Sequence, residues 1–146
     1  MVINVRKIFW IRFKKKLTPE EYEVCVNRGT EPPFSGNLLS NKENGIYSCK
    51  CCGSTLFDSD SKYDSKSGWP SFWAPSNNEN IQEKVDYDYG MVRKEVVCAK
   101  CGCHLGHLFE DGPNPTGLRY CINSLSLDFK KKTNPSWWNY IIFKEY

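Results

Sequence analysis

Long apolar runs are missing from this chain of 146 residues, and so are internal repeats beyond two short cysteine motifs. No stretch approaches the roughly 20 apolar residues that a membrane-spanning helix needs, so we expect no membrane span. The N-terminus contains neither an uninterrupted apolar segment nor a small-residue cleavage site, which argues against a secretory signal peptide. Histidine is scarce as well, with only His104 and His107 in the chain.

Acidic residues are absent from the first sixteen positions, MVINVRKIFWIRFKKK, although the whole chain has a net charge of only +3. So small a charge implies no broad electrostatic partner. The basic residues also lack the interleaved groove pattern of a nucleic-acid site, so we expect no nucleic-acid partner. We predict that residues 1–16 form an arm whose aromatic side chains pack on the domain. The alternatives are an organelle-targeting segment and an amphipathic surface element. Otherwise we expect a cytoplasmic monomer.

The chain length and a hydrophobic content of 40% suit one packed domain rather than two, and we place this domain at residues 17–132. The segment 133–146 ends in an aromatic cluster that includes Trp137, Trp138 and Phe143. We predict that this segment docks on the domain as a strand or a helix. An exposed interaction patch is the alternative.

Local signals predict a helical start followed by an antiparallel β domain. In LTPEEYEVCVNRG, Thr18 is a good N-cap, Pro19 suits the first helical position, and Gly29 is expected to end the helix. From residue 46 onward, short apolar runs alternate with turn residues, which is typical of strands. The candidate strands are 46–49, 54–57, 91–99, 104–109 and 119–127. The predicted fold class is therefore mainly β, with two antiparallel layers and a short N-terminal helix.

The chain has eight cysteines, several of which lie in two matching phrases, CKCCG and CAKCG. Each is a C-x-x-C pair followed by glycine, which tolerates the positive φ of a sharp metal-binding turn. The match selects Cys49, Cys52, Cys98 and Cys101 as ligands of one structural Zn²⁺, because four thiolates make a closed tetrahedral site. The 45 residues from 53 to 97 do not fit one compact finger. We therefore expect a metal that clamps two hairpin ends together in a protein from a reducing compartment. Iron in this site and two redox-active dithiols are the alternatives.

The stretch GLRYCINSLSLDF predicts a strand with two functions. Side chains alternate along a strand, so Arg119, Cys121 and Asn123 share one face while Tyr120 and Ile122 point into a core. A guanidinium beside a thiol favours the thiolate, which is the nucleophilic form. After these residues the apolar side chains change face, so we predict a bulge, a bend or a change of burial there.

Two further phrases contain candidate functional residues. His104 and His107 in CHLGHLF could be spare metal ligands, structural residues, or proton-transfer groups beside a thiolate. In SGWPSFW, Trp69, Phe72 and Trp73 lie around a turn rich in glycine and proline. They are core aromatics or, where exposed, an apolar surface that grips a substrate.

Five phrases together resemble the B-type methionine sulfoxide reductases: GTEPPFSG, YSCKCCGSTLF, YDSKSGWPSFW, EVVCAKCGCHLGHLFEDGPNPTG and LRYCINS. They occur in the family's order and cover residues 17–130. The resemblance implies a zinc-stapled fold of two antiparallel sheets. It also implies repair of oxidative damage by reduction of the R epimer of methionine sulfoxide, in proteins or free.

The resemblance assigns roles to individual residues. Cys121 is at the position of the family's nucleophile, and Arg119 lies in the same motif. The family's active-site polar residues are at the positions of His104, His107 and Asn123. Trp69 is at the position of the family's tryptophan whose indole packs against the substrate methyl group. Phe72 and Phe109 are further candidate substrate contacts.

The implied reaction proceeds through a cysteine sulfenic acid. The Cys121 thiolate attacks the sulfoxide sulfur, and His107, assisted by His104, protonates the departing oxygen. A second thiol then forms a disulfide, which thioredoxin or another external thiol reduces.

The sequence departs from its relatives at the resolving thiol. Many relatives carry a cysteine just before GWPSF, where this chain has Ser67. Cys25 is our first candidate for the resolving thiol. Direct reduction by an external thiol is the second possibility, and Cys51 or Cys103 is the third.

Two other classes of function compete with the reductase. A non-catalytic zinc-stapled binding module needs the four ligands but has no use for Arg119, Cys121, Asn123 and the two histidines together. A chaperone or exchange role on the same fold is the other alternative, and the intact RYCINS motif argues against it.

Overall fold

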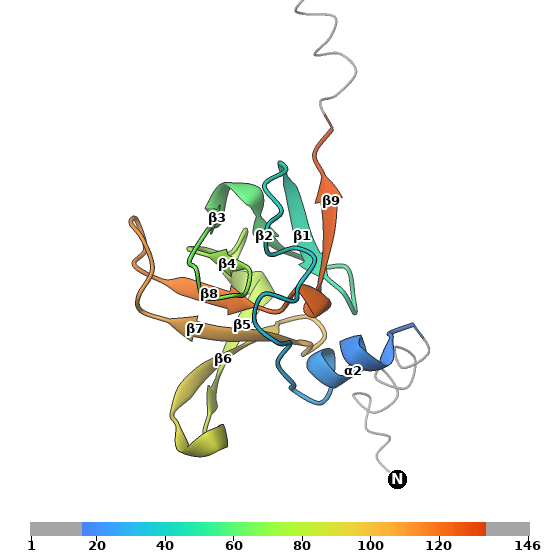
Figure 1. The fold of residues 1–146 in the computed structure, drawn as a ribbon, viewed down its shortest axis with the longest axis vertical. Helices are drawn as coiled ribbons and strands as arrows, with labels where there is room; N and C mark the ends of the chain where they lie inside the picture. Colours follow the sequence, from blue (N-terminus) through green and yellow to red (C-terminus); the bar gives the residue numbers. More distant parts are fainter. Residues whose placement is uncertain (1–15, 134–146) are drawn as a thin grey trace, which may run out of the picture.

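A computed structural model describes residues 16–133 of the chain. Apart from Lys16 and Thr133, the two predicted terminal extensions lie outside this part, and the predictions about them stay predictions. Figure 1 shows the described part as two β-sheets with one α-helix beside them. Within residues 16–133, no helix is long and apolar enough to cross a membrane.

All strand pairs in the two sheets are antiparallel, which confirms the predicted fold class. The smaller sheet has the strand order β2-β1-β9 and the larger sheet has the order β3-β4-β8-β7-β6-β5. The strands are β1 (Gly45–Cys49), β2 (Thr55–Asp58), β3 (Lys62–Tyr63), β4 (Ser71–Phe72), β5 (Ile81–Asp86), β6 (Arg93–Cys98), β7 (His104–Phe109), β8 (Arg119–Ile122) and β9 (Leu127–Lys131).

The helix α2 (Pro19–Cys25) begins as predicted. The Thr18 hydroxyl accepts a hydrogen bond from the Glu21 amide, and the Glu21 carboxylate accepts one from the Thr18 amide. This reciprocal capping box satisfies two of the free amides at the helix start. The predicted end at Gly29 is wrong, because the helix stops at Cys25 and the chain then turns through Arg28 at φ 61°.

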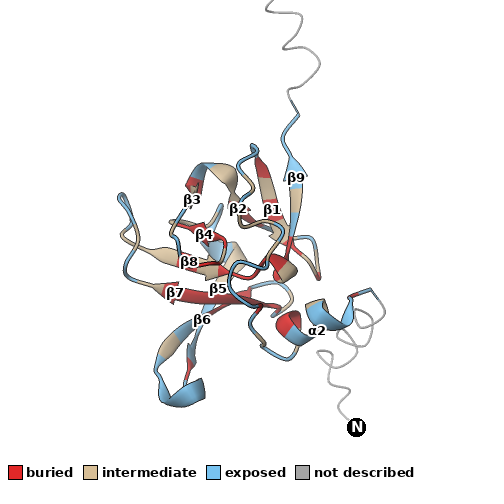
Figure 2. Cartoon of the chain, in the orientation of Figure 1, coloured by how far each residue is buried: buried red, intermediate tan, exposed pale blue. Residues whose placement is uncertain are grey.

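Aromatic rings fill the core between the two sheets. Phe57 stacks on Phe72 with ring centroids 4.4 Å apart, and Tyr47 meets the Phe72 ring edge-on at 5.0 Å. All three rings are fully buried. Figure 2 shows buried residues along β1 and β7, while the tip of the β5–β6 hairpin is exposed. The β7–β8 pair is therefore anchored on one side by the core.

The predicted strand over 119–127 divides between the two sheets. β8 ends at Ile122, a 3₁₀ helix spans Ser124–Ser126, and β9 begins at Leu127 in the smaller sheet. The predicted break in the alternation is thus confirmed, as a change of sheet. Burial along β8 alternates as predicted, with Tyr120 and Ile122 buried.

Three strands were not predicted. β3 and β4 have two residues each, which is too short for an alternating pattern to be read. β5 has six residues, but most of them are exposed and polar, so it lacks an apolar face.

Candidate active site and metal centre

Two tight turns bring four thiols together between the sheets. The first turn joins β1 to β2 and the second joins β6 to β7. In both turns the glycine after the second cysteine has a positive φ, 77° at Gly53 and 79° at Gly102. The two glycine amides donate to the carbonyls of Cys49 and Cys98, each at 2.8 Å. The same local conformation therefore aims each pair of thiols inward.

The geometry of the four thiols fits a tetrahedral metal. The Sγ atoms of Cys49, Cys52, Cys98 and Cys101 all lie within 4.8 Å of one another. Two of the cross-pair distances, Cys49–Cys101 and Cys52–Cys98, are both 3.6 Å. Four sulfurs at about 2.3 Å from Zn²⁺ would be about 3.8 Å apart, so the observed spacing suits this ion. The predicted ligand set is thus confirmed as a group that can bind a metal.

Three of the remaining cysteines form a second group. Cys25 on α2 meets Cys51 and Cys103 from the two turns, with all three Sγ atoms within 4.8 Å of one another. Each of the three residues is at most 1% exposed. The sequence motifs leave Cys51 and Cys103 without partners, because the register of the C-x-x-C pairs does not include them.

The eighth cysteine, Cys121, lines a separate pocket of about 190 Å³. The pocket brings together residues from β6, from β7, from β8 and its C-terminal end, from the loop after α2 and from the loop between β3 and β4. Its lining comprises Thr30, Ser67, Trp69, Arg93, Gly106, His107, Phe109, Arg119, Cys121 and Asn123. A larger depression of about 720 Å³ elsewhere on the described surface has neither a cysteine nor a histidine in its lining. The smaller pocket is therefore the candidate site.

The β7–β8 pairing sets the positions of the two reactive groups. His107 and Cys121 are directly opposite each other in the register of the two strands. A Cβ added to Gly106 would overlap the carbonyl oxygen of Cys121, so only glycine permits this close approach.

Burial and charge act in opposite directions on the Cys121 thiol. Burial raises the pKa of Cys121 above its usual value, and this effect exceeds the opposing effects of the Arg119 charge and of hydrogen bonds from Ser67 and Arg119. Arg119 therefore favours the thiolate as predicted, but it does not decide the net direction. Its guanidinium also forms two hydrogen bonds to Asp111, at 2.8 and 3.2 Å, and lies 4.4 Å from the centre of the Phe109 ring.

His107 is held by a buried carboxylate from β5. Its Nε2 lies 2.8 Å from Oδ2 of Asp86, which is 3% exposed. Burial lowers the pKa of His107, and the hydrogen bond to Asp86 opposes this shift. Burial alone would raise the pKa of Asp86, but the Asp88 amide, His107 and Arg93 together hold it at about 2. The carboxylate is therefore charged at neutral pH.

The His104 ring packs against the His107 ring and does not line the pocket. The two rings meet edge-on with centroids 5.6 Å apart. The His104 Nδ1 is 3.7 Å from Glu95, and neither ring nitrogen has a hydrogen-bond partner among the described residues. Arg28 donates to the same Glu95 carboxylate at 2.7 Å and also lies 3.4 Å from Asp86. A network of charged residues therefore supports both imidazoles.

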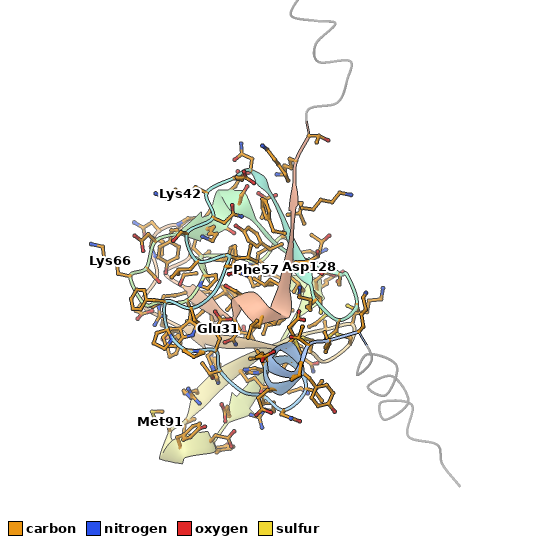
Figure 3. The ribbon with its side chains drawn as sticks, turned by 45° about the vertical axis from the view of Figure 1, so that its right-hand side comes forward. Glu31, Lys42, Phe57, Lys66, Met91 and Asp128 are labelled. Atoms are coloured by element: carbon orange, nitrogen blue, oxygen red, sulfur yellow. The ribbon has the colours of Figure 1, made fainter. Side chains whose placement is uncertain are left out.

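Glu31, labelled in Figure 3, lies in the loop after α2 and holds two predicted site residues through its backbone. Its backbone carbonyl accepts a hydrogen bond from the Trp69 indole at 2.9 Å, and its amide donates to the Asn123 side-chain oxygen at 3.0 Å. Asn123 also donates to the Leu105 carbonyl at 2.9 Å. Both ends of the Asn123 amide are thus used by the backbone, so this residue joins the loop to the sheet.

The other predicted substrate contacts differ in position. Phe109 and Trp69 line the pocket. Phe72 does not, because its ring lies fully buried in the core against Phe57. The structure also adds residues that the sequence gave no reason to select, namely Thr30, Glu31, Asp86, Arg93 and Glu95. The phrases of the resemblance were the one signal for three of them, GTEPPFSG for Thr30 and Glu31 and EVVCAKCGCHLGHLFEDGPNPTG for Glu95.

Comparisons with known proteins relate the chain to one family over most of its length. The SelR domain family matches residues 17–131. A peptide methionine sulfoxide reductase MsrB from Methanosarcina barkeri is 58% identical over 118 residues, covering 81% of this chain and 83% of that protein. The MsrB protein of Acinetobacter baylyi is 55% identical over 118 residues, covering 81% of this chain and 85% of that protein.

One comparison among solved structures concerns the fold alone. The Mis18 'Yippee-like' domain aligns with a TM-score of 0.51 and 17% sequence identity. The alignment covers 63% of this chain and all of that domain (100%).

Proposed function

Because this chain belongs to the MsrB family of peptide methionine sulfoxide reductases, we propose that it reduces the R epimer of methionine sulfoxide, free or in proteins, with Cys121 as the nucleophile. The observation that carries this proposal is the pocket that gathers one thiol, one imidazole and one indole. These are the groups that a nucleophilic attack, a proton transfer and the binding of a methyl group require.

The first step forms a bond from the Cys121 sulfur to the sulfoxide sulfur. The attacking species is the thiolate, because the thiol is a much weaker nucleophile. The sulfur–oxygen bond of the substrate and the new sulfur–sulfur bond then break as the protonated oxygen passes to Cys121, which leaves methionine and a cysteine sulfenic acid. The methionine sulfur is reduced by two electrons, and the cysteine sulfur is oxidised by two.

His107 is the proposed acid for the departing oxygen. Its Nε2 is bonded to Asp86, which leaves the other ring nitrogen for the substrate. A proton on that nitrogen requires the imidazolium form, which the Asp86 charge stabilises against the effect of burial. His104 acts through the His107 ring and the Glu95 carboxylate, since it does not line the pocket.

Trp69 and Phe109 are the proposed contacts for the apolar end of the substrate. The indole is partly exposed, and its hydrogen bond to the Glu31 carbonyl fixes the ring at the pocket wall. An aromatic face offers a methyl group apolar contact while the sulfoxide oxygen points toward His107. We assign Asn123 the role of holding the Glu31 loop against β7 rather than of binding the oxygen.

The Cys121 sulfenic acid then condenses with a second protein thiol to form a disulfide and water, and an external thiol reduces the disulfide, or else an external thiol reduces the sulfenic acid directly. Thioredoxin or a small thiol is the proposed reductant. Cys25 stays the internal candidate, although it is buried with Cys51 and Cys103 and does not line the Cys121 pocket. A disulfide requires sulfurs about 2.05 Å apart, so this route demands a movement of α2 or of β8.

Zinc is the proposed ion for Cys49, Cys52, Cys98 and Cys101. Four thiolates leave no open coordination position, so the ion stabilises the fold and takes no part in the reaction. A cytoplasmic location and a monomeric state stay predictions.

Turnover of the separate R and S epimers with dithiothreitol tests the function. We expect the wild type to reduce only the R epimer, and Cys121→Ser to have no activity, while Cys25→Ser keeps wild-type activity because dithiothreitol replaces an internal thiol. Activity of Cys121→Ser on the R epimer would exclude Cys121 as the nucleophile.

Thioredoxin in place of dithiothreitol tests the resolving thiol. If Cys25 resolves the sulfenic acid, Cys25→Ser should lose thioredoxin-dependent turnover but retain dithiothreitol-dependent turnover. Unchanged turnover with thioredoxin would remove Cys25 from the cycle and leave direct reduction as the route.

A further inference from the structure

The three buried cysteines outside both the four-thiol group and the pocket form a site of their own. Cys25 comes from α2, Cys51 from the turn between β1 and β2, and Cys103 from the turn between β6 and β7. The three residues are far apart in the sequence, yet their Sγ atoms all lie within 4.8 Å of one another. We propose that these three cysteines form a trigonal thiolate site for a soft monovalent cation, Cu(I).

The spacing of the sulfurs fits a shared ion. Three sulfurs placed around a metal at about 2.3 Å would be about 4 Å apart in a trigonal plane. The observed separations between the three Sγ atoms, all at most 4.8 Å, are compatible with this value. A small inward movement of the three side chains would therefore close the site, without any change in the positions of the strands.

The donor set and its burial favour Cu(I) over zinc. Thiolates are soft ligands, and Cu(I) prefers them and accepts three of them. Structural zinc almost always takes four ligands. Cys25 and Cys51 are each 1% exposed and Cys103 is 0% exposed, so water has no access as a fourth ligand.

The contacts of the free thiols are weak enough for a metal to replace them. Cys25 donates to the Leu125 carbonyl at 3.7 Å, and Cys103 donates to the His104 carbonyl at 3.6 Å. Both are long, weak sulfur–oxygen hydrogen bonds. Metal–thiolate bonds are much stronger, and an ion here would tie α2 to both turns.

The proposed site adjoins the four-thiol group but uses different sulfurs. The Cys103 amide donates to the Cys101 sulfur at 3.4 Å, which places the two groups side by side. Cys49, Cys52, Cys98 and Cys101 belong to one group and Cys25, Cys51 and Cys103 to the other, so no sulfur is shared. The two groups are therefore expected to be filled together rather than in competition.

Anaerobic titration of the reduced, zinc-loaded full chain with Cu(I), against a chromogenic Cu(I) chelator, tests the site. We expect the wild type to hold one Cu(I) per chain while its zinc content stays constant. Cys25→Ser should bind Cu(I) more weakly by at least about 100-fold and keep its zinc, because Cys25 lies on the helix and outside the zinc turns. Cys121→Ser is the matched control, since it also removes one thiol but should bind Cu(I) like the wild type.

Several results would overturn the proposal. Release of zinc in step with Cu(I) uptake would place Cu(I) in the four-thiol group. Equal Cu(I) affinity in the wild type and Cys25→Ser would exclude Cys25 as a ligand. If Cys25→Ser does not fold, X-ray absorption spectroscopy of the Cu(I)-loaded wild type tests the site instead. We expect three sulfur ligands around Cu(I), and any other set of ligands would contradict the proposal. These measurements use no substrate, so they are independent of the proposed reductase activity.

Discussion

The reactivity of Cys121 depends on a balance of opposing effects at one sulfur atom. Burial raises the pKa of the thiol, while Arg119 and Ser67 lower it. The net shift is upward, so the thiolate fraction increases as the pH rises through the alkaline range. The first step also needs protonated His107, whose pKa is lowered, so we expect its rate to be nearly constant between the pKa values of His107 and Cys121 and to fall on either side.

Removal of the Ser67 hydroxyl should shift this pH profile. Ser67→Ala deletes a hydrogen bond to the sulfur that favours the thiolate, so the pKa of Cys121 should rise further. We expect the alkaline limb of the single-turnover rate to move to higher pH and the rate at pH 7 to fall about threefold to tenfold. Ser67→Thr keeps a hydroxyl and serves as the control. An unchanged limb in Ser67→Ala would show that Ser67 does not affect the thiol.

Asp86 should contribute stability that depends on pH. Its pKa in the folded chain is about 2, below the value of about 3.9 expected in an unfolded chain. A lowered pKa gives a contribution that is complete above about pH 4 and is lost as the pH falls through about 2. Asp86→Asn should therefore cost roughly 2 kcal/mol in the free energy of unfolding at pH 7, and less in acid.

Urea unfolding of the wild type and of Asp86→Asn across this pH range measures the effect. Asp88→Asn is the matched control, because Asp88 lies in the same hairpin with an exposed side chain. A loss of stability that stays constant from pH 7 to pH 2.5 would contradict the assignment.

At the scale of elements, the close pairing of β7 and β8 makes the site. The register places His107 opposite Cys121, and Gly106 allows the two backbones to approach. The sequence predicted the existence of both strands and the alternation along β8. It did not predict their register, because register depends on cross-strand contacts rather than on local pattern.

Gly106→Ala should separate these two strands. The new methyl group would overlap the Cys121 carbonyl, so β7 must shift away from β8. We expect a loss of at least about tenfold in kcat/KM and about 1–3 kcal/mol in stability. Gly90→Ala is the control, since Gly90 has φ 69° but open space around its Cα, so it should lose only about 1 kcal/mol and keep its activity. Full activity of Gly106→Ala would show that the strand spacing is not critical.

At the scale of the whole molecule, the four-thiol group joins the two sheets. One turn belongs to the smaller sheet and the other to the larger sheet, so an ion between them crosslinks both halves of the core. The chain itself also connects the two sheets, because the 3₁₀ helix Ser124–Ser126 joins β8 of the larger sheet to β9 of the smaller sheet close to the Cys121 pocket. The pocket therefore depends on how the two sheets are held together.

Removal of the metal should destabilise the entire fold. Binding free energy at a structural zinc site is folding free energy, so a metal-free chain should melt at least about 10 °C lower. Thermal unfolding before and after treatment with a chelator measures this shift, and metal analysis should find about one zinc per chain beforehand. Addition of zinc is the control and should restore the melting temperature. An unchanged melting temperature after confirmed metal loss would contradict a structural role.

The sequence alone determined the features that depend on a few neighbouring residues. These are the Thr18 cap, the two C-x-x-C-G turns and the alternation along β8. Each follows from backbone geometry over one turn or one strand. The repeated turn was enough to predict four metal ligands, because both copies must adopt the same conformation.

Only the tertiary structure decided which distant groups meet. The bond from Asp86 to His107, the contact of Glu31 with Asn123 and the meeting of Cys25 with two other thiols all join separate elements. Such contacts depend on the order, register and packing of the sheets, which no local pattern encodes. The net direction of the Cys121 pKa belongs to the same class, since burial is a property of the packed molecule.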